Sequence, residues 1–189
     1  VSWNDGDAWQ PLTMNLPVTQ VSDLVVEDHD LVISTHGRSF WVMRSIGPLR
    51  QMTAEVAAAD FWLFDPKDPV RRFDRTVDID YYLTEDADKV MLEFMDASGE
   101  VLATFESPDE EEAEEEEDEF AAFFGGGGSQ TPPTTAGSNR FRWNQRLAGW
   151  TDFDGRIFWA ASNQGPSVLP GRYQVRITVD GESMTQDFE

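Results

Sequence analysis

The stretch GRYQVRITVDGESMTQDF, residues 171–188, carries the clearest structural signal in the chain. Short runs of alternating and β-branched side chains lie on both sides of Asp180-Gly181, as expected of two strands that each bury one face. Asp-Gly is favoured at the centre of a two-residue hairpin because both central positions take positive φ. We therefore predict an antiparallel hairpin that closes the chain.

The same pattern recurs along most of the sequence, with turn-forming residues such as Asn4-Asp5-Gly6 and Ala97-Ser98-Gly99 between the runs. Aromatic residues make up 12% of the chain and include seven Trp, enough large side chains to fill a β core. We predict an all-β protein. Its expected strands are residues 21–26, 30–34, 39–43, 77–83, 90–95, 100–106, 139–143, 155–160, 171–179 and 183–188.

Two segments interrupt the strand pattern. Residues 51–61 are the one helix-compatible stretch, and the prolines around it predict a linker over residues 47–70 between two domains. Residues 107–138 are of low complexity, with an acidic run followed by four glycines. Such a segment buries too little apolar surface to offset its ordering entropy, so we predict a disordered insert within a domain that spans residues 71–189.

The formal charge of −22, from 36 acidic and 14 basic residues, excludes several functional classes. Nucleic acids and anionic membranes bind basic surfaces, so neither is an expected partner. The chain has no Cys, which removes disulfides and thiolate chemistry. No apolar run reaches the length of a membrane span, and we expect no transmembrane segment. Because Val1 is not a start methionine, we expect the chain to begin inside a longer protein.

The segment SWNDGDAW at residues 2–9 is close to the Asp-box pattern Ser-x-Asp-x-Gly-x-Thr-Trp. Asn4 stands in the Asp position, where a short polar side chain can bond the backbone of its own turn. Gly6 supplies the unusual dihedral angles of the turn, and Trp9 is expected to pack the hairpin onto a neighbour. Ser2, Asn4, Gly6 and Trp9 are therefore predicted to be structural residues.

The phrase THGRSFWV at residues 35–42 follows, with the apolar strand LVIS before it. Together with the Asp-box, it resembles the end of bacterial sortilin-like, Asp-box (BNR) repeat β-propellers of the glycosyl-hydrolase type. The resemblance implies that residues 1–46 are the last strands of a propeller, and that the rest of that propeller is their partner. It also implies an exported protein, found outside the cell, in the periplasm or in the cell envelope.

The remainder resembles the immunoglobulin-like or fibronectin-like domain that follows such propellers. The resemblance rests on DYYL at 80–83, residues 90–105, NRFRW at 139–143 and PGRYQVR at 170–176. It implies a β-sandwich over residues 71–189.

The sequence gives little indication of a catalytic or metal-binding site. Three carboxylate pairs have a spacing that places both side chains on one face of a strand or turn, and calcium is a candidate ligand for them. A zinc site lacks ligands, because His29 and His36 are the only imidazoles and there is no Cys. The three pairs are Asp5 with Asp7, Asp78 with Asp80, and Asp152 with Asp154.

Three tryptophans in the last third, Trp143, Trp150 and Trp159, are candidates for a platform that stacks on sugars. Their alternative role is to fill a core, as aromatic residues on short strands commonly do.

We expect a non-catalytic structural or interaction module with no catalytic residues and no required cofactor. The alternatives are a part of a glycoside hydrolase or peptide-binding propeller whose active centre lies in other blades, or a carbohydrate-binding sandwich.

Overall fold

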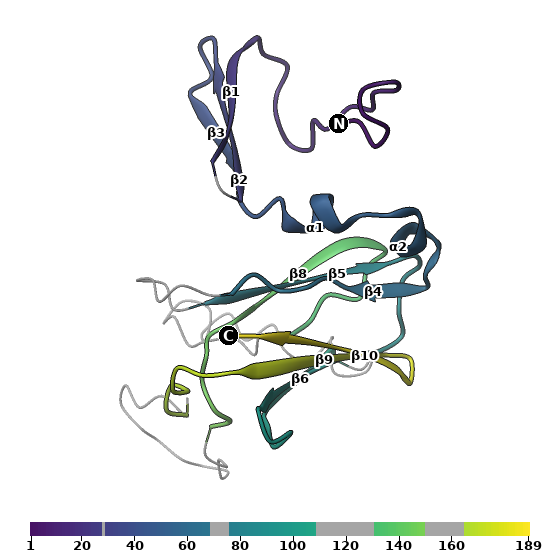
Figure 1. Cartoon of the computed structure of the whole chain (residues 1–189), viewed down its shortest axis with the longest axis vertical. Helices are drawn as coiled ribbons and strands as arrows, with labels where there is room; N and C mark the ends of the chain where they lie inside the picture. The colour runs from purple at the N-terminus through teal and green to yellow at the C-terminus, as the bar shows by residue number, and fades with distance from the viewer. Residues whose placement is uncertain (28, 69–75, 109–130, 150–164) are drawn as a thin grey trace. The chain divides into compact units, whose positions relative to one another are not determined.

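The computed structural model describes residues 1–27, 29–68, 76–108, 131–149 and 165–189. The described chain consists mostly of antiparallel strands with two short helices, which confirms the all-β class (Figure 1). It divides into two compact units, Val1–Gly47 and Pro48–Glu189. The strand predicted at residues 155–160 lies outside the described residues.

The first unit contains one sheet of three strands, β1 (Val21–Glu27), β2 (Asp30–Thr35) and β3 (Phe40–Met43), in that spatial order. Both pairs are antiparallel, and β2 lies in the centre. The turn between β2 and β3 contains Gly37 at φ 83° and Ser39 at φ 65°. These left-handed residues let the chain reverse within the THGRSFWV phrase.

The second unit contains two antiparallel sheets that enclose one core. The smaller sheet has the order β4-β5-β8, and the larger has the order β10-β9-β6-β7. The strands are β4 (Phe61–Leu63), β5 (Val77–Leu83), β6 (Val90–Asp96), β7 (Val101–Glu106), β8 (Gly137–Trp143), β9 (Tyr173–Val179) and β10 (Glu182–Phe188).

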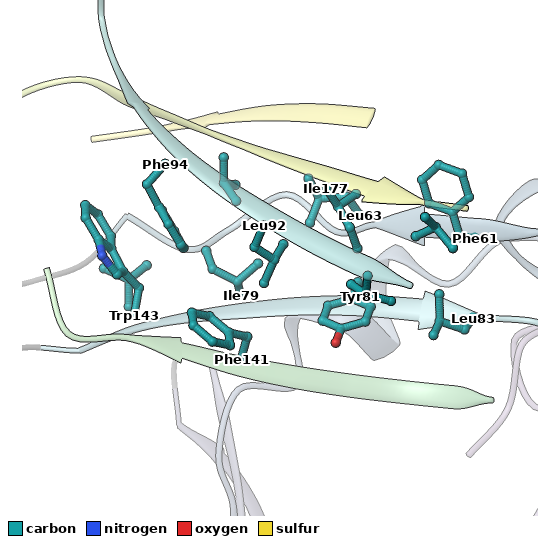
Figure 2. Close-up of a cluster of buried hydrophobic side chains, with 14 of the residues drawn as sticks. Phe61, Leu63, Ile79, Tyr81, Leu83, Leu92, Phe94, Phe141, Trp143 and Ile177 are labelled. Carbon is teal, nitrogen blue, oxygen red and sulfur yellow. The ribbon is translucent and has the colours of Figure 1, made fainter. Parts of the chain in front are cut away.

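Strict alternation along the strands builds this core. β5 alternates buried and half-buried residues along its whole length, so Val77, Ile79, Tyr81 and Leu83 all point inward. Figure 2 shows Ile79, Tyr81 and Leu83 facing side chains of β6 and β9 in the other sheet, with those of the neighbouring β8 beside them. Both sheets therefore contribute one apolar face each to the same core, which is the arrangement the alternating sequence pattern requires.

The closing hairpin forms as predicted. Asp180 has φ 48° and Gly181 has φ 96°, and they connect β9 to β10 in continuous register from Val179–Glu182 to Tyr173–Phe188. The Asp180 carboxylate also accepts a hydrogen bond from the Lys89 amide at 2.9 Å, which ties the hairpin to the start of β6.

The predicted linker at residues 47–70 contains more structure than expected. Instead of one helical stretch at residues 51–61, there are two single-turn helices, α1 (Gly47–Gln51) and α2 (Ala54–Ala58). The Thr53 hydroxyl accepts a hydrogen bond from the Val56 amide and caps α2. Phe61–Leu63 forms β4, which pairs with β5 and buries Leu63 completely. The linker assignment was wrong for these residues because apolar burial, not helix propensity, decides their conformation.

The predicted insert at residues 107–138 falls mostly outside the described residues, but its two flanks are well defined. The Ser107 amide donates to the Val90 carbonyl at 2.9 Å, and the Ser107 hydroxyl accepts from the Val90 amide at 3.0 Å. On the other flank, the buried Tyr81 hydroxyl donates to the Pro133 carbonyl at 2.5 Å. Because β8 begins at Gly137, the predicted insert extends too far toward the C-terminus.

Candidate interaction surface on the first unit

The Asp-box segment forms a closed, hydrogen-bonded turn. The Asn4 side-chain oxygen accepts from the Ala8 amide at 2.9 Å, so Asn performs the bonding expected of the Asp in the pattern. The Ser2 hydroxyl oxygen accepts from the Gly6 amide at 2.8 Å, and Gly6 has φ 96°. The structure therefore brings Ser2, Asn4 and Gly6 together in one turn.

Backbone bonds between Val1 and Gln10 close the base of this turn. The Gln10 amide donates to the Val1 carbonyl at 2.8 Å, and the Val1 amino group donates to the Gln10 carbonyl at 2.7 Å. Trp9 was expected to pack onto a neighbouring element, but 74% of its surface is exposed. The turn is locally complete, and the Trp9 ring lies beside Gly6 of the same turn.

One face of the first unit's sheet carries six apolar side chains, with Thr35 beside them at the end of β2. The register places Leu24, Ile33 and Trp41 in one row across the three strands, and Val26, Leu31 and Met43 in a second row. Because residues two apart along a strand share a face, the two rows lie on the same side of the sheet. We call this six-residue set the apolar face.

The opposite face is mixed. Val25, Val32 and Val42 form one apolar row, and the flanking rows place Asp23 beside Ser34 and Glu27 beside Asp30. Alternation of this kind, with one apolar and one partly charged side, is typical of a sheet that covers a core on one side only.

The apolar face is only partly covered within the described chain. On β1, Leu24 is 55% exposed and Val26 is 47% exposed. The other four residues of the face, on β2 and β3, are half-buried. The main core cluster of the described residues takes all its members from residues 61–188 and none from the first unit. Complete burial of an aliphatic side chain contributes about 1.5–3 kcal/mol, so a cover over this face would add substantially to its stability.

The next candidates are the three tryptophans predicted to stack on sugars. Trp143 is fully buried, and its ring stacks on Phe94 with centroids 4.2 Å apart and planes 15° apart (Figure 2). Its indole N–H donates to the Arg146 carbonyl at 3.3 Å. The platform assignment was therefore wrong for Trp143, which fills the core. Trp150 and Trp159 lie outside the described residues.

The Asp78 and Asp80 carboxylates face arginine side chains. Arg140 Nε lies 2.6 Å from Asp80 Oδ1, and Arg142 Nε lies 3.3 Å from Asp78 Oδ1. Burial raises the pKa of Asp80, and the ion pair with Arg140 opposes that shift. Among the described residues, no group of three His, Cys, Asp or Glu side chains could hold a metal ion.

The remaining candidates that the structure describes do not come together in one site. Asp5 and Asp7 lie in the Asp-box turn, and Asp152 and Asp154 lie outside the described residues. Of the two imidazoles, His29 precedes β2 and His36 follows it. Both make backbone hydrogen bonds outside the strands: the His36 N–H donates to the Gln20 carbonyl at 2.8 Å, and the His29 carbonyl accepts from the Ile46 amide at 2.7 Å.

A shallow cavity of about 470 Å³ lies at one end of the second unit, where Tyr173 and Phe188 meet several polar side chains. These polar groups bond one another. Gln174 donates to Asp187 at 2.7 Å, and Arg172 lies 3.5 Å from Glu189. The cavity was not predicted from the sequence, because its wall combines residues from the two ends of the β9–β10 hairpin with Asp68.

No protein-family model and no curated protein matches this chain. Within the described part of the chain, no helix is long and apolar enough to cross a membrane.

Proposed function

We propose that this chain is a non-catalytic structural and interaction module of an exported sortilin-like propeller protein. In this proposal the first unit supplies strands to a propeller, and the second unit is the immunoglobulin-like domain beside it. The observation that carries the proposal is the apolar face of the first unit, where Leu24 and Val26 remain about half exposed. A sheet with such a face gains stability when a second apolar layer covers it, as neighbouring blades do in a propeller.

The Asp-box geometry supports the propeller part of the proposal. Asn4 and Ser2 bond the turn backbone, and the Trp9 ring lies beside Gly6 with 74% of its surface exposed. An exposed Trp on a locally complete turn is suited to packing against a neighbouring blade. Trp9 then has the packing role inferred from the sequence, with a partner outside the described residues.

Strand order supports the immunoglobulin-like part. Counted along the second unit, strands one, two and five form the smaller sheet, and strands seven, six, three and four form the larger. This matches the division of strands between the two sheets of an immunoglobulin-like sandwich whose fourth strand joins the larger sheet. The Tyr173 hydroxyl at the start of β9 donates to the Leu169 carbonyl, as in the tyrosine corner of such domains. The buried Trp143 lies on β8, whereas antibody domains carry theirs on the third strand.

The charge arrangement supports a non-catalytic role. Asp78 and Asp80 are neutralised by Arg140 and Arg142, so this pair is not arranged as the acid and base of a glycosidase.

Dye binding and matched variants test the proposal. We expect the wild-type chain to bind the apolar dye ANS, and Leu24→Lys to lower the bound fluorescence by about half or more. Val101→Lys is the control, because Val101 is a similarly exposed apolar residue on β7 of the second unit. The proposal fails if the two variants behave alike, or if the chain hydrolyses any of a panel of aryl glycosides.

A further inference from the structure

The cavity at the end of the second unit has a rigid aromatic wall. Tyr173 and Phe188 form the last register pair of the β9–β10 hairpin, and their ring centroids lie 5.9 Å apart. The fully buried Trp143 ring packs edge-on against both, at 6.1 Å and 6.2 Å. The Tyr173 hydroxyl donates to the Leu169 carbonyl, which restricts the ring further. A ligand in the cavity therefore meets rings that are already held in place, so little ordering is needed on binding.

The cavity also has a polar wall, because it extends across the end of the hairpin. Successive residues of a strand point to opposite faces, so Gln174 and Asp187 lie on the face away from Tyr173 and Phe188. All four residues line the cavity. A ligand seated there contacts aromatic side chains on one side and polar side chains on the other.

The polar wall offers hydrogen-bonding atoms that no described residue uses. Gln174 Nε2 bonds Asp187 Oδ1 at 2.7 Å, and the Glu189 amide bonds Asp68 Oδ1 at 2.9 Å. Among the described residues, the second carboxylate oxygen of each aspartate has no hydrogen-bond donor. Arg172 Nε lies 3.5 Å from Glu189 Oε2, which is longer than a normal hydrogen bond, and the Arg172 side chain is 81% exposed.

These atoms favour a ligand whose groups both donate and accept hydrogen bonds. A carboxylate such as Asp187 only accepts, whereas the Arg172 guanidinium only donates. An ammonium ligand can bond the first but not the second, and an anionic ligand would also face the carboxylates of Asp68, Asp187 and Glu189. A hydroxyl group donates and accepts, so neighbouring hydroxyls of one ligand can bond both kinds of side chain.

We propose that this cavity binds a neutral sugar. Its hydroxyls bond Asp68, Asp187 and Arg172, and its apolar C–H face packs against Tyr173. The volume of about 470 Å³ lies within the range of about 300–1,000 Å³ that is usual for small-ligand sites. Sugar recognition is thereby placed at the end of the β9–β10 hairpin and not on the predicted tryptophans. The proposal goes beyond the proposed function and does not depend on the apolar face, which belongs to the first unit.

Backbone amide NMR of the full chain tests this proposal. The probes are the methyl glycosides of glucose, galactose, mannose and N-acetylglucosamine. A methyl hexoside has about 13 non-hydrogen atoms, for which ordinary ligand efficiency gives a Kd of about 1 mM. We expect at least one of them to shift the amides of Tyr173, Gln174 and Asp187 with a Kd in this range. Tighter binding of a trisaccharide of the same sugar would identify a glycan chain as the source, and equal binding a single sugar unit.

Three small probes separate sugar recognition from simpler chemistry. Propylammonium carries only donors, propionate carries only acceptors, and N-methylacetamide carries one of each without neighbouring hydroxyls. We expect none of them to shift the same amides at about 10 mM, ten times the Kd expected for the sugar. Sugar binding should change less than about twofold between about 0.05 M and about 0.5 M salt, because salt screens charges and the ligand has none.

Matched variants make the test specific. Asp187→Ala removes a charged acceptor and should weaken sugar binding at least about tenfold. Thr185→Ala is its control, because Thr185 is exposed on the same face of β10 and does not line the cavity. Arg172→Ala should weaken binding about threefold or more, and Arg38→Ala, at an exposed arginine of the first unit, is its control. The amide spectrum of each variant shows whether the second unit is folded.

Three results would overturn the proposal. They are the absence of binding by every sugar of the panel, shifts of the same amides by any of the three small probes at equal concentration, and equal effects of Asp187→Ala and Thr185→Ala. Strong shifts by propylammonium that disappear in high salt would identify a cation site in place of a sugar site. The ANS experiment reports on the first unit, so a failure here leaves the proposed function standing.

Discussion

The two units use the same kind of sheet in opposite ways. In the second unit, β5 and β8 turn their apolar side chains toward β6 and β9, and Ile79, Leu92 and Ile177 are fully buried. In the first unit, β1, β2 and β3 carry an equally apolar face, but Leu24 and Val26 stay about half exposed. The difference teaches that strand pairing alone does not complete a β domain. A second layer does, and among the residues that the structure describes only those of the second unit form one.

The largest expected contrast is between two tryptophans. Trp143→Ala should lower the free energy of unfolding of the second unit by about 3–5 kcal/mol, because it leaves a large cavity beside Phe94. Trp41→Ala in the first unit should cost less than about 1.5 kcal/mol, since its site is only partly buried. A urea titration followed by amide NMR separates the two units. Equal losses for the two variants would mean that the first unit has a core of its own.

A smaller effect tests the immunoglobulin-like assignment of the second unit. Tyr173→Phe removes the hydroxyl that bonds the Leu169 carbonyl and should cost about 1 kcal/mol. Tyr82→Phe, on the half-buried side of β5, serves as the control. Both are measured by urea unfolding. If Tyr173→Phe has the same free energy of unfolding as the control, the Tyr173 hydroxyl does not stabilise the domain as a tyrosine corner does.

The predicted insert allows a test of whether residues 109–130 contribute to the stability of the second unit. Its flanks are tied by the Ser107–Val90 bonds and by the Ala87 amide, which donates to the Thr134 carbonyl at 2.9 Å. Replacing residues 109–130 with a short Gly-Ser linker should therefore keep the fold. It should also raise the free energy of unfolding by about 1 kcal/mol, because closing a shorter connection costs less chain entropy. Thermal unfolding measures this change. Loss of folded protein would show that the insert contributes to the core.

The smallest expected effect concerns pH. Burial raises the pKa of Asp80 above its ordinary value of 3.8, so the folded state holds this proton more tightly than the unfolded state. The resulting stability is fully present below pH 3.8 and is lost as the pH rises through the raised folded pKa. Asp80→Asn should remove this pH dependence, measured by urea unfolding across that range. An unchanged profile would mean that Arg140 cancels the effect of burial.

Much of the local structure follows from local chemistry. The Asp180-Gly181 turn, the Asp-box turn and nine strands formed near their predicted positions, because alternation and turn residues act over a few neighbours. β4 was missed because three residues after a helix-compatible stretch carry too little periodic signal. Its conformation depends on pairing with β5 and on burial of Leu63.

The closing hairpin, with its Asp180-Gly181 turn, was determined by the sequence alone, as was the all-β class. Side-chain alternation and backbone dihedral preferences are local properties, so the sequence expresses them directly. Tertiary structure alone decided which of the described tryptophans are buried and which are exposed. Trp143 became a buried core residue stacked on Phe94, and Trp9 became an exposed one. The physical reason is that exposure depends on which sheets lie face to face, and strands distant in the sequence determine that arrangement.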